Sequence, residues 1–428
     1  MKDKFEVIVV GGGLAGLTAA HLLAGSGFEV MVLERGNHCG EKNVSGGVCC
    51  GESFQDVFGD LASDAPIERH IKRKILACVC GHSVVSYDYC NGQPGEDLGF
   101  SVLRGKFDRW LGEKVVEAGA DMLCGVAVDD VVFDNGIAKG ISVNGERLYA
   151  DVVILAEGAN ALLTEKIGFR TKLRPYQMGL GVREAIRLGE TTINDRFNLD
   201  PGEGTAIELF GTFTEQIEGG GFLYTNKDTI SLGLVFTLAS YSEEHSPPYD
   251  ILEYFKSIPY VAKLIEGGET VEYSAHMVPE VGLEMLPTIY GNGILVVGDA
   301  AGFTLKNGRN VEGMNYAIES GKLAAETVIK AVQFGDYSAE TLSEYERSIR
   351  RNSLFKRLMK YKETYKFFQN PRLYKEYPEL VANFSKTLFG DGDYPDSRIL
   401  GLLLQTAKSA DLTVGNMVSD MVRSQKLL

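Results

Sequence analysis

The sequence has little of what marks membrane, disulfide-rich and metal-binding proteins. It contains one tryptophan, six histidines and seven cysteines. No stretch comes near the run of about 18 apolar residues that a membrane-spanning helix needs, so none is expected. The histidines show no HExxH or other paired-ligand spacing, and we therefore expect no metal site.

The cysteines are confined to the first third of the chain. Their odd number argues against a disulfide framework, and their spacings match no four-cysteine iron–sulfur cluster. Cys49 and Cys50 are adjacent and so lack the spacing of a redox-active cysteine pair. We expect inert thiols, buried or half-exposed. The seven are Cys39, Cys49, Cys50, Cys78, Cys80, Cys90 and Cys124.

The net charge and the length of the chain further restrict which kind of protein this is. The net charge of −15 and the pI of about 5.0 argue against nucleic acid as the main partner. A chain of 428 residues is long enough for two or three domains. The first apolar run belongs to the nucleotide motif described next and not to a signal peptide, so we expect a cytoplasmic protein.

The N-terminal stretch has the order of elements that a bound dinucleotide requires. Residues 5–16 read FEVIVVGGGLAG, an apolar run followed by closely spaced glycines. Residues 17–23 continue with helical spacing, and a second apolar run at 28–33 ends in Glu34. A strand, a tight turn, a helix and a strand that ends in an acid predict a dinucleotide-binding fold.

Each glycine of this GxGxxG motif has a physical task. Gly11 makes the turn, Gly13 lets the backbone approach a pyrophosphate, and Gly16 lets helix and strand pack closely. The helix N-terminus offers free N–H groups and a partial positive charge to phosphates. Glu34 is placed to accept hydrogen bonds from ribose hydroxyls.

The glycine-rich segment 36–51 follows this motif. It is too dense in glycine for a regular element and too apolar for a linker, which indicates an ordered loop over a ligand. Ser45, Gly46 and Gly47 are expected to bring backbone amides against a flat ring.

A predicted helix at 104–118 follows strand-like residues 71–89. Arg104, at the start of this helix, is a candidate contact for a phosphate or a ribityl chain, with an ordinary surface arginine as the alternative. We expect Asp108 and Arg109 to be solvated.

The middle of the chain is predicted to be mainly β. Segments 126–132 and 137–143 form a hairpin pattern around an Asn-Gly turn, and 151–158 is another buried strand. Strand-like segments then alternate with glycine turns as far as residue 284. Pro247-Pro248 and Pro259 each predict the start of a helix. A cavity is expected where such a β domain meets the nucleotide fold.

The parallel-strand pattern returns at residues 293–302, GILVVGDAAG. Asp299 follows the strand, where its carboxylate is positioned to accept a hydrogen bond from a ribityl hydroxyl. The segment 307–315 leads into a helix at 316–332, whose N-terminus would stabilise negative charge on a reduced ring.

These motifs together resemble the glutathione-reductase-type FAD fold. They are GGGLAG with Glu34, RxxFDxxL at 104–111, AEG at 156–158 and GDAAG at 298–302. The branch is the one shared by aromatic hydroxylases, geranylgeranyl reductases and electron-transfer flavoprotein:quinone oxidoreductases. Many members have Ala-Asp-Gly where this chain has Glu157, a mild departure.

Four longer stretches resemble the short FixC-type subunits of the quinone-oxidoreductase family. They are GEKNVSGGV at 40–48, GGGFLYTN at 219–226, NGRNVEGMNYAI at 307–318 and NPRLYKEYPEL at 370–380. The resemblance spans nearly the whole chain. It implies FAD as the prosthetic group, the α and β subunits of an electron-transfer flavoprotein as electron donor, and a quinone as acceptor. Since no cysteine follows Cys124, it also implies a separate ferredoxin-like iron–sulfur subunit.

The resemblance and the motifs together give the expected FAD-binding residues. They are Gly11, Gly13, Leu14, Ala15, Gly16, Glu34, Arg35, Lys42, Ser45, Gly46, Arg104, Ala127, Glu157, Gly158, Gly298, Asp299, Gly308, Val311, Gly313 and Met314. No catalytic residue is identified, because electron transfer through a flavin needs no dedicated nucleophile or base.

The expected fold is α/β: a Rossmann-type FAD-binding domain, an inserted mainly β quinone domain and a helical C-terminal region. The FAD-binding domain is predicted in three parts, and strands 76–100 are assigned to the substrate domain. The predicted divisions are 1–75, 76–100, 101–170, 171–287, 288–335 and 336–428.

Two other enzyme functions and one non-enzymatic role fit the sequence less well. A geranylgeranyl-reductase-like enzyme would show a tyrosine–tryptophan–phenylalanine–proline pattern, but the only tryptophan is Trp110. An FAD-dependent aromatic monooxygenase needs a nicotinamide cofactor, and no second GxGxxG motif follows a strand, although hydroxylases can bind NADPH without one. A binding protein without activity would not need intact nucleotide motifs.

Residues 347–372 form a basic stretch with nine Lys or Arg and one acid. It predicts either a solvated helical face or a contact with anionic lipid or an acidic partner subunit. Apolar residues in 249–265, namely Leu252, Phe255, Tyr260 and Leu264, are expected to contact a membrane. We expect peripheral attachment at the inner face of the cytoplasmic membrane. The apolar patches at 399–404 and 417–428 are candidates for docking a subunit.

Overall fold

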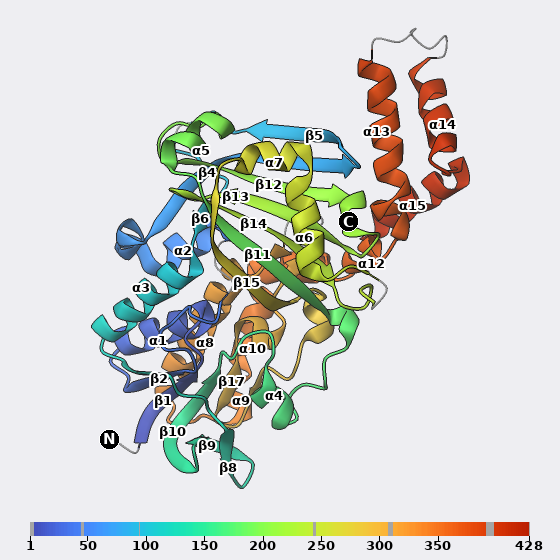
Figure 1. Cartoon of the computed structure of the whole chain (residues 1–428). Helices are drawn as coiled ribbons and strands as arrows, with labels where there is room; N and C mark the ends of the chain where they lie inside the picture. The colour runs from blue at the N-terminus through green and yellow to red at the C-terminus, as the bar shows by residue number, and fades with distance from the viewer. Residues whose placement is uncertain are drawn as a thin grey trace.

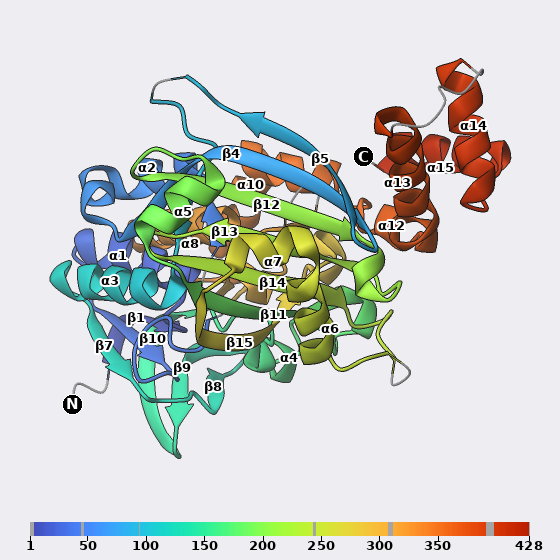
Figure 2. The ribbon, with the colours of Figure 1, turned by 45° about the horizontal axis from the view of Figure 1, so that its top comes forward.

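The computed structural model describes residues 4–43, 47–93, 95–242, 245–306, 311–390 and 398–427. Two large sheets dominate the molecule, one in the nucleotide-binding part and one above it (Figure 1). A group of C-terminal helices projects from the side of the second sheet (Figures 1 and 2). This arrangement confirms the predicted α/β class and the helical C-terminal region.

The nucleotide-binding sheet is built on the first strand. β1 (Lys4–Val10) pairs in parallel with β10 (Glu146–Leu155) and with β2 (Val30–Glu34). The strand order is β16 (Tyr290–Gly291), β17 (Ile294–Val296), β10, β1, β2 and β7 (Asp121–Cys124), and β8 (Asp130–Asp134) and β9 (Ile137–Val143) extend the sheet from β10. The central stretches of these parallel strands, such as residues 7–10 and 152–155, are apolar and buried because both faces of the sheet are covered. Helix α1 (Leu14–Gly25) packs against α3 (Arg104–Glu117) and α8 (Met314–Val332).

The second sheet collects strands from distant parts of the chain. Its order is β15 (Glu269–Pro279), β11 (Met178–Arg187), β14 (Thr229–Thr237), β13 (Gly219–Thr225), β12 (Glu203–Gly211), β4 (Ile67–Cys80), β6 (Phe100–Val102) and β3 (Gly47–Cys49), with β5 (Ser83–Cys90) paired to β4. The short strands β18 (Leu305–Lys306) and β19 (Val311–Glu312) pair separately.

Alternate residues of the second sheet face opposite ways. Val182, Ile207, Leu223 and Leu232 belong to an apolar core shared with α6 (Pro248–Ser257) and α7 (Pro259–Ile265). Their neighbours in sequence point to the other face, because the side-chain period of a strand is two residues. That inner face is turned toward the nucleotide-binding part.

Helices α6 and α7 begin at the predicted prolines, but the four apolar residues expected to contact a membrane pack against the second sheet. Leu252 and Phe255 are fully buried against the sheet, and Tyr260 and Leu264 pack against the same core. The expectation that these residues contact a membrane is therefore wrong. Their amphipathic spacing reflects burial on the sheet.

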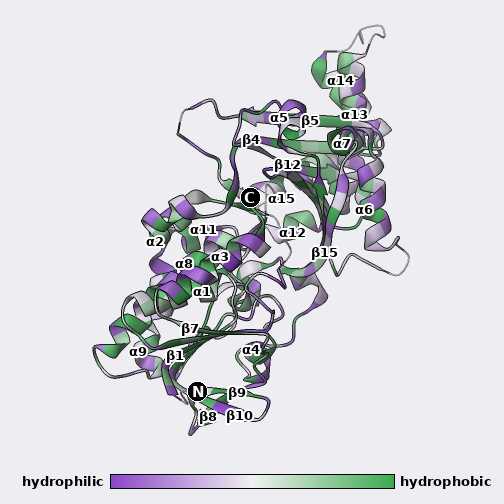
Figure 3. Cartoon of the chain, turned by 60° about the vertical axis from the view of Figure 1, so that its left-hand side comes forward, coloured by the Kyte–Doolittle hydropathy of each residue, from purple (hydrophilic) through white to green (hydrophobic). Residues whose placement is uncertain are grey.

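The C-terminal helices end in a hairpin that stands away from the body (Figures 1 and 2). It consists of α13 (Glu376–Phe389) and α14 (Ile399–Ser409), with α15 (Val414–Leu427) packed beside them on a small core that includes Leu380 and Leu412. Hydropathy colouring shows apolar strands inside and mixed helical surfaces outside (Figure 3). Within the described ranges, every helix is too short or too polar to cross a membrane.

The remaining helices are short. They are α2 (Gly51–Phe58), α4 (Leu162–Lys166), α5 (Glu190–Phe197), α9 (Ala339–Leu342), α10 (Glu344–Arg351), α11 (Ser353–Lys360), α12 (Tyr365–Phe368) and the 3₁₀ turns η1 (Gly59–Asp64), η2 (Pro175–Gln177), η3 (Thr212–Thr214), η4 (Gly282–Met285), η5 (Gly298–Ala301) and η6 (Pro371–Tyr374).

Candidate functional site

A continuous cavity of about 960 Å³ lies between the two sheets. One end is formed by the turn after β1 and by the ends of β2 and β10. The other end is formed by the inner face of the second sheet and by η6. A cavity of this size at a domain interface suits a cofactor together with a second molecule.

The glycines of the GxGxxG motif shape the nucleotide end. A side chain at Gly11, whose φ is +116°, would place its Cβ 2.2 Å from the carbonyl oxygen of Ala156. A Cβ at Gly16 would lie 2.1 Å from the carbonyl oxygen of Gly11. At Gly13 a Cβ would meet no protein atom within 4 Å, although Gly13 lines the cavity. Gly11 and Gly16 thus permit close packing, and Gly13 leaves space for a ligand.

Glu34 ends β2 at the wall of the cavity and is held by backbone amides. Gly12 N donates to its Oε2 at 2.8 Å, and Gly36 N donates to its Oε1 at 2.6 Å. These contacts fix a carboxylate at the position where the dinucleotide fold binds ribose hydroxyls.

Arg104 lines the cavity from the first turn of α3. Its Nε and Nη2 donate to the two carboxylate oxygens of Asp108, each at 2.8 Å. Asn43 Nδ2 also donates to Asp108, at 2.5 Å. Asp108 is completely buried, so the expectation that it is solvated is wrong; Arg109 is exposed, as expected. Asp108 orients Arg104.

Asp299 and the N-terminus of α8 form another part of the cavity wall. A Cβ at Gly313, which precedes α8, would lie 3.7 Å from Asp299 Oδ1. Burial raises the pKa of the Asp299 carboxyl, and the nearby Arg104 opposes this increase. An acceptor carboxylate and the positive end of a 19-residue helix therefore face the same space.

Most residues predicted to bind FAD line this cavity. They are Gly11, Gly13, Leu14, Ala15, Glu34, Arg35, Lys42, Arg104, Ala127, Glu157, Gly158, Gly298, Asp299, Val311, Gly313 and Met314. Gly16 lies behind the wall, in the contact between α1 and β1. Ser45, Gly46 and Gly308 lie outside the described residues.

Glu157 has a partner of its own. Its carboxylate accepts hydrogen bonds from the backbone amides of Leu163 and Thr164, at 2.8 and 2.7 Å, and from the Thr164 hydroxyl. The side chain therefore satisfies the free amides at the start of α4.

Sequence reasoning missed the polar residues on the inner face of the second sheet. Lys74, Arg183, Glu208, Tyr224 and His276 all line the cavity. Burial lowers the pKa of His276, and the positive charges of Arg35 and Arg104 lower it further, so its ring is neutral at pH 7. A single polar residue between apolar neighbours, such as Glu208 between Ile207 and Leu209, is the signal that could have identified this face.

Six of the seven cysteines are buried or half-buried, as expected. Cys39, Cys49 and Cys78 are buried, whereas Cys90 is exposed. Burial raises the pKa of Cys49 to about 12, which keeps it a neutral thiol. No group of three or more His, Cys, Asp or Glu within the described ranges could hold a metal ion.

Two family models match the chain. Residues 9–45 match an NAD(P)-binding Rossmann-like domain, and residues 179–278 match a domain described as "ETF-QO, ubiquinone-binding". The first contains the glycine motif and Glu34. The second covers the strands of the second sheet from β11 to β15.

Relatives match over most of the length. Protein FixC of Escherichia coli K12 is 42% identical over 398 residues, 92% of this chain and 93% of the relative. The probable electron transfer flavoprotein-quinone oxidoreductase YdiS of the same strain is 38% identical over 428 residues, 100% of this chain and 99% of its own. FixC of Azorhizobium caulinodans is 38% identical, with 89% of each chain covered.

Solved structures share the fold at low identity. A geranylgeranyl bacteriochlorophyll reductase-like protein (Ta0516) from Thermoplasma acidophilum has a TM-score of 0.73 at 20% identity, covering 96% of this chain and 98% of that one. The myxobacterial FAD-dependent halogenase CndH has a TM-score of 0.65 at 18% identity, covering 95% and 97%. Such identities show a common fold alone.

The fold, the glycine motif and the relatives define an FAD-dependent oxidoreductase. The shape of the glycine motif fits a bound FAD, since the space over Gly13 is open while Gly11 and Gly16 are closely packed. More narrowly, the chain belongs to the FixC family of electron-transfer-flavoprotein:quinone-oxidoreductase-like proteins.

Proposed function

We propose that this chain takes electrons from an electron-transfer flavoprotein and passes them through FAD to a quinone in the cavity. One observation carries the proposal. The cavity runs without interruption from the glycine motif to the inner face of the strands that match a ubiquinone-binding family model. Cofactor and acceptor would therefore occupy one space.

We assign the FAD site to residues at the nucleotide end. Gly13 and the start of α1 would face the pyrophosphate, Glu34 the ribose, and Asp299 the ribityl chain. FAD supplies the redox chemistry when bound, and the protein supplies position and charge. Arg104, held by Asp108, adds a fixed positive charge beside Asp299.

The inner sheet face suits a flat, apolar acceptor. Phe222 and Tyr224 stack on each other with ring centroids 5.0 Å apart, and both line the cavity. Phe367 and Phe368 close the far end. Aromatic rings around a few polar groups are the usual lining of a site for a small ring compound.

A protein donor is proposed because the sequence has one GxGxxG motif, which the FAD would occupy. We infer that any iron–sulfur cluster on the route belongs to a separate ferredoxin-like subunit. In support, the cysteines end at Cys124, and within the described residues none takes part in a group able to hold a metal.

We also propose peripheral attachment to a membrane, through a different surface from the one first expected. The distal end of the α13–α14 hairpin exposes large apolar residues. Phe389 is 82% exposed, Ile399 71% and Leu400 67%. The hairpin extends away from the body (Figure 2), where it would meet a flat surface without obstruction.

The test of the proposed function is a reconstituted electron transfer. The FAD-loaded chain is mixed without oxygen with a reduced electron-transfer flavoprotein, and a short-chain benzoquinone is then added. We expect the flavin absorbance to bleach with the donor and to return with the quinone. A chain whose flavin the donor reduces but the quinone does not reoxidise would contradict a quinone as acceptor.

A further inference from the structure

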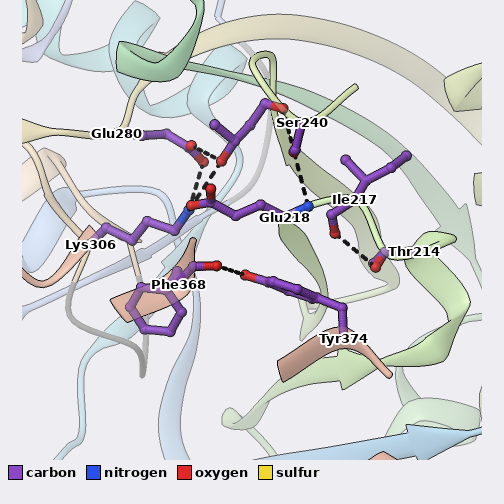
Figure 4. Close-up of polar contacts among 9 residues, drawn as sticks. Thr214, Ile217, Glu218, Ser240, Glu280, Lys306, Phe368 and Tyr374 are labelled. Atoms are coloured by element: carbon purple, nitrogen blue, oxygen red, sulfur yellow. Dashed lines mark hydrogen bonds and ion pairs between the residues drawn. The ribbon is translucent and has the colours of Figure 1, made fainter. Parts of the chain in front are cut away.

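A buried cluster of charges lies at the far end of the cavity (Figure 4). Lys306 Nζ is 3.1 Å from Glu218 Oε1 and 3.3 Å from Glu280 Oε1. It lies 3.4 Å from Thr237 Oγ1, whose hydroxyl donates to Glu280. The side chains of Glu218, Glu280 and Lys306 are 9%, 2% and 12% exposed. Lys306 and Glu280 line the cavity.

Among the residues that the structure describes, the cluster contains more acid than base. Two carboxyl groups share one ammonium in a buried setting, and the facing group from η6 is Tyr374, which cannot supply positive charge. Burial raises the pKa of Glu218, Lys306 opposes this, and Glu280 adds to it. One proton held by the carboxyl pair removes the uncompensated charge. Holding one proton would therefore be favourable for this pair of carboxyl groups.

Its surroundings keep the cluster in place. Tyr374 donates to the carbonyl oxygen of Phe368 at 2.9 Å, and the ring of Phe368 lies 5.6 Å from Lys306 Nζ (Figure 4). A Cβ at Gly179 would lie 2.7 Å from Glu280 Oε1, so the carboxyl is packed directly against glycine backbone. The groups therefore come from separate parts of the chain and meet at the cavity wall.

A short segment of the chain that lines the cavity connects Lys306 with the FAD end. Lys306 ends β18, two residues after Thr304, and a Cβ at Gly313 would lie 4.0 Å from Thr304 Oγ1. The hydroxyl of Thr304 is buried and lacks a hydrogen-bond partner among the described residues. A polar ligand atom would find this hydroxyl and Lys306 only two residues apart in the chain.

We propose that Lys306 binds a carbonyl oxygen of the acceptor and protonates it, with Glu218 and Glu280 supplying the proton. The inference rests on the proposed function and adds its proton donor. The longest contact of the ammonium, 3.4 Å to Thr237, is the one a carbonyl oxygen would replace. Thr237 keeps its bond to Glu280.

The step balances as a two-electron reduction. The quinone gains two electrons and one proton from the reduced FAD, and its second proton comes from Lys306 Nζ. The C=O double bonds become C–O single bonds and two O–H bonds form, giving the quinol. Lys306 regains its proton from the carboxyl pair, which is reprotonated from solvent after the quinol leaves.

The test compares reoxidation of the reduced, FAD-loaded protein by two acceptors in stopped flow. A short-chain benzoquinone needs protons, whereas a ferricenium salt takes electrons only. We expect Lys306→Met to slow reoxidation by the quinone about 10²-fold, in the range of general acid catalysis, and to leave reoxidation by ferricenium unchanged. Glu218→Gln should remove the fall in rate that the wild type shows as pH rises.

A second readout needs no turnover. Calorimetric titration of the oxidised protein with the same benzoquinone should show about tenfold weaker binding for Lys306→Met, the loss of one charge-assisted hydrogen bond. Lys256→Met is the matched control, because Lys256 also bridges two carboxylates, Glu184 and Glu253, at 2.9 and 2.6 Å but does not line the cavity.

The outcomes separate the two proposals. A wild type that reacts with ferricenium but never with quinone removes the proposed function and this inference with it. A wild type that reduces quinone while Lys306→Met matches it in rate and binding overturns this inference alone. If Lys306→Met does not fold, Glu218→Gln decides, since an unchanged falling pH profile in that variant also overturns it.

Discussion

Arg104 and Asp108 form a buried, two-pronged ion pair one helical turn apart on α3. Both hydrogen bonds measure 2.8 Å, and the aspartate is completely buried while the arginine reaches the cavity. Paired hydrogen bonds between guanidinium and carboxylate fix the plane of both groups. The pair thus aims a positive charge at the space proposed for FAD.

The first prediction concerns this pair. Asp108→Asn leaves the Arg104 charge without its partner, and breaking a buried pair costs about 3 kcal/mol. We expect the free energy of unfolding of the apoprotein to fall by that amount in urea titrations, and FAD to dissociate more readily. Glu117→Gln is the control, since Glu117 pairs with Lys114 on the exposed side of the same helix. Equal stability of Asp108→Asn and wild type would contradict the positioning role.

The sequence contained the evidence for the burial of Asp108. Asp108 lies on the face of α3 that carries Phe107, Leu111 and Val115, and all four are buried. Helical spacing therefore predicts that the carboxylate points inward. Treating each charged residue separately as solvated led to the wrong expectation.

The nucleotide end was predictable because its residues are contiguous in sequence and each has a defined geometric task. The acid cluster was not, since Glu218, Glu280 and Lys306 are brought together only by the second sheet and β18. The apolar residues of α6 show a second reason why the sequence alone was not sufficient. Their spacing is the same whether Phe255 covers a sheet or a membrane, and only the folded chain distinguishes the two.

The second prediction concerns FAD binding and compares Gly13, the N-cap of α1, with Gly25, the last residue of this helix. Gly13→Ala meets no protein atom, so the fold should be retained, but the methyl group occupies space next to the proposed pyrophosphate. We expect at least about tenfold weaker FAD binding, measured by fluorescence titration of the apoprotein. Gly25→Ala, also free of contacts but at the far end of the helix, should bind FAD like the wild type. Equal affinity of both variants would remove Gly13 from the site.

The third prediction concerns the electron donor. With its one GxGxxG motif assigned to FAD, the isolated chain should not be reduced rapidly by nicotinamide cofactors. Anaerobic mixing with NADH or NADPH at micromolar concentration should leave the oxidised flavin spectrum unchanged for minutes. Rapid bleaching would instead favour a monooxygenase or an isoprenoid reductase.

The fourth prediction concerns how the C-terminal helices are fastened. Arg372 donates to both oxygens of Asp420, at 2.8 and 2.7 Å, and Tyr377 donates to one of them at 2.9 Å. The hydrogen bond from Arg372 lowers the pKa of Asp420 to about 2. A depressed carboxyl pKa adds stability above its unfolded value, and this stability is lost as the pH falls from about 4 to about 2.

Removing that carboxylate should release α15. In Asp420→Asn the free energy that holds α15 on the body should fall by about 1–2 kcal/mol at neutral pH. It should also no longer change between about pH 4 and about pH 2. Hydrogen exchange of α15 amides, followed from pH 5 downward, should show early opening in the variant and a pH-dependent loss of protection in the wild type. The same pH dependence in both proteins would rule out Asp420 as the titrating group.

The last prediction tests membrane attachment. Phe389, Ile399 and Leu400 lie at the distal end of the α13–α14 hairpin, and fully burying such a side chain is worth about 1.5–3 kcal/mol. The protein and anionic lipid are both negatively charged and repel each other, but salt screens this repulsion beyond about 10 Å. The burial of the three apolar side chains can therefore outweigh it. Exposed Lys356, Lys360 and Lys362 add attraction of about 1 kcal/mol each where they reach the surface. The other basic residues of 347–372 contribute less, because each is paired with an acid: Arg347, Arg350, Arg351, Arg357, Lys366 and Arg372.

Sedimentation with lipid vesicles distinguishes the apolar contribution of the hairpin from the electrostatic contribution of the lysines. The wild type should sediment with anionic vesicles at low salt, and changing the three hairpin residues to Ser should abolish binding at every salt concentration. Changing the three lysines to Gln should weaken binding at low salt only. Phe334→Ser is the control, since Phe334 is 76% exposed at the end of α8, away from the hairpin. If the wild type stays in the supernatant with anionic vesicles at low salt, the hairpin does not bind lipid by itself, and its apolar end is better assigned to a protein partner.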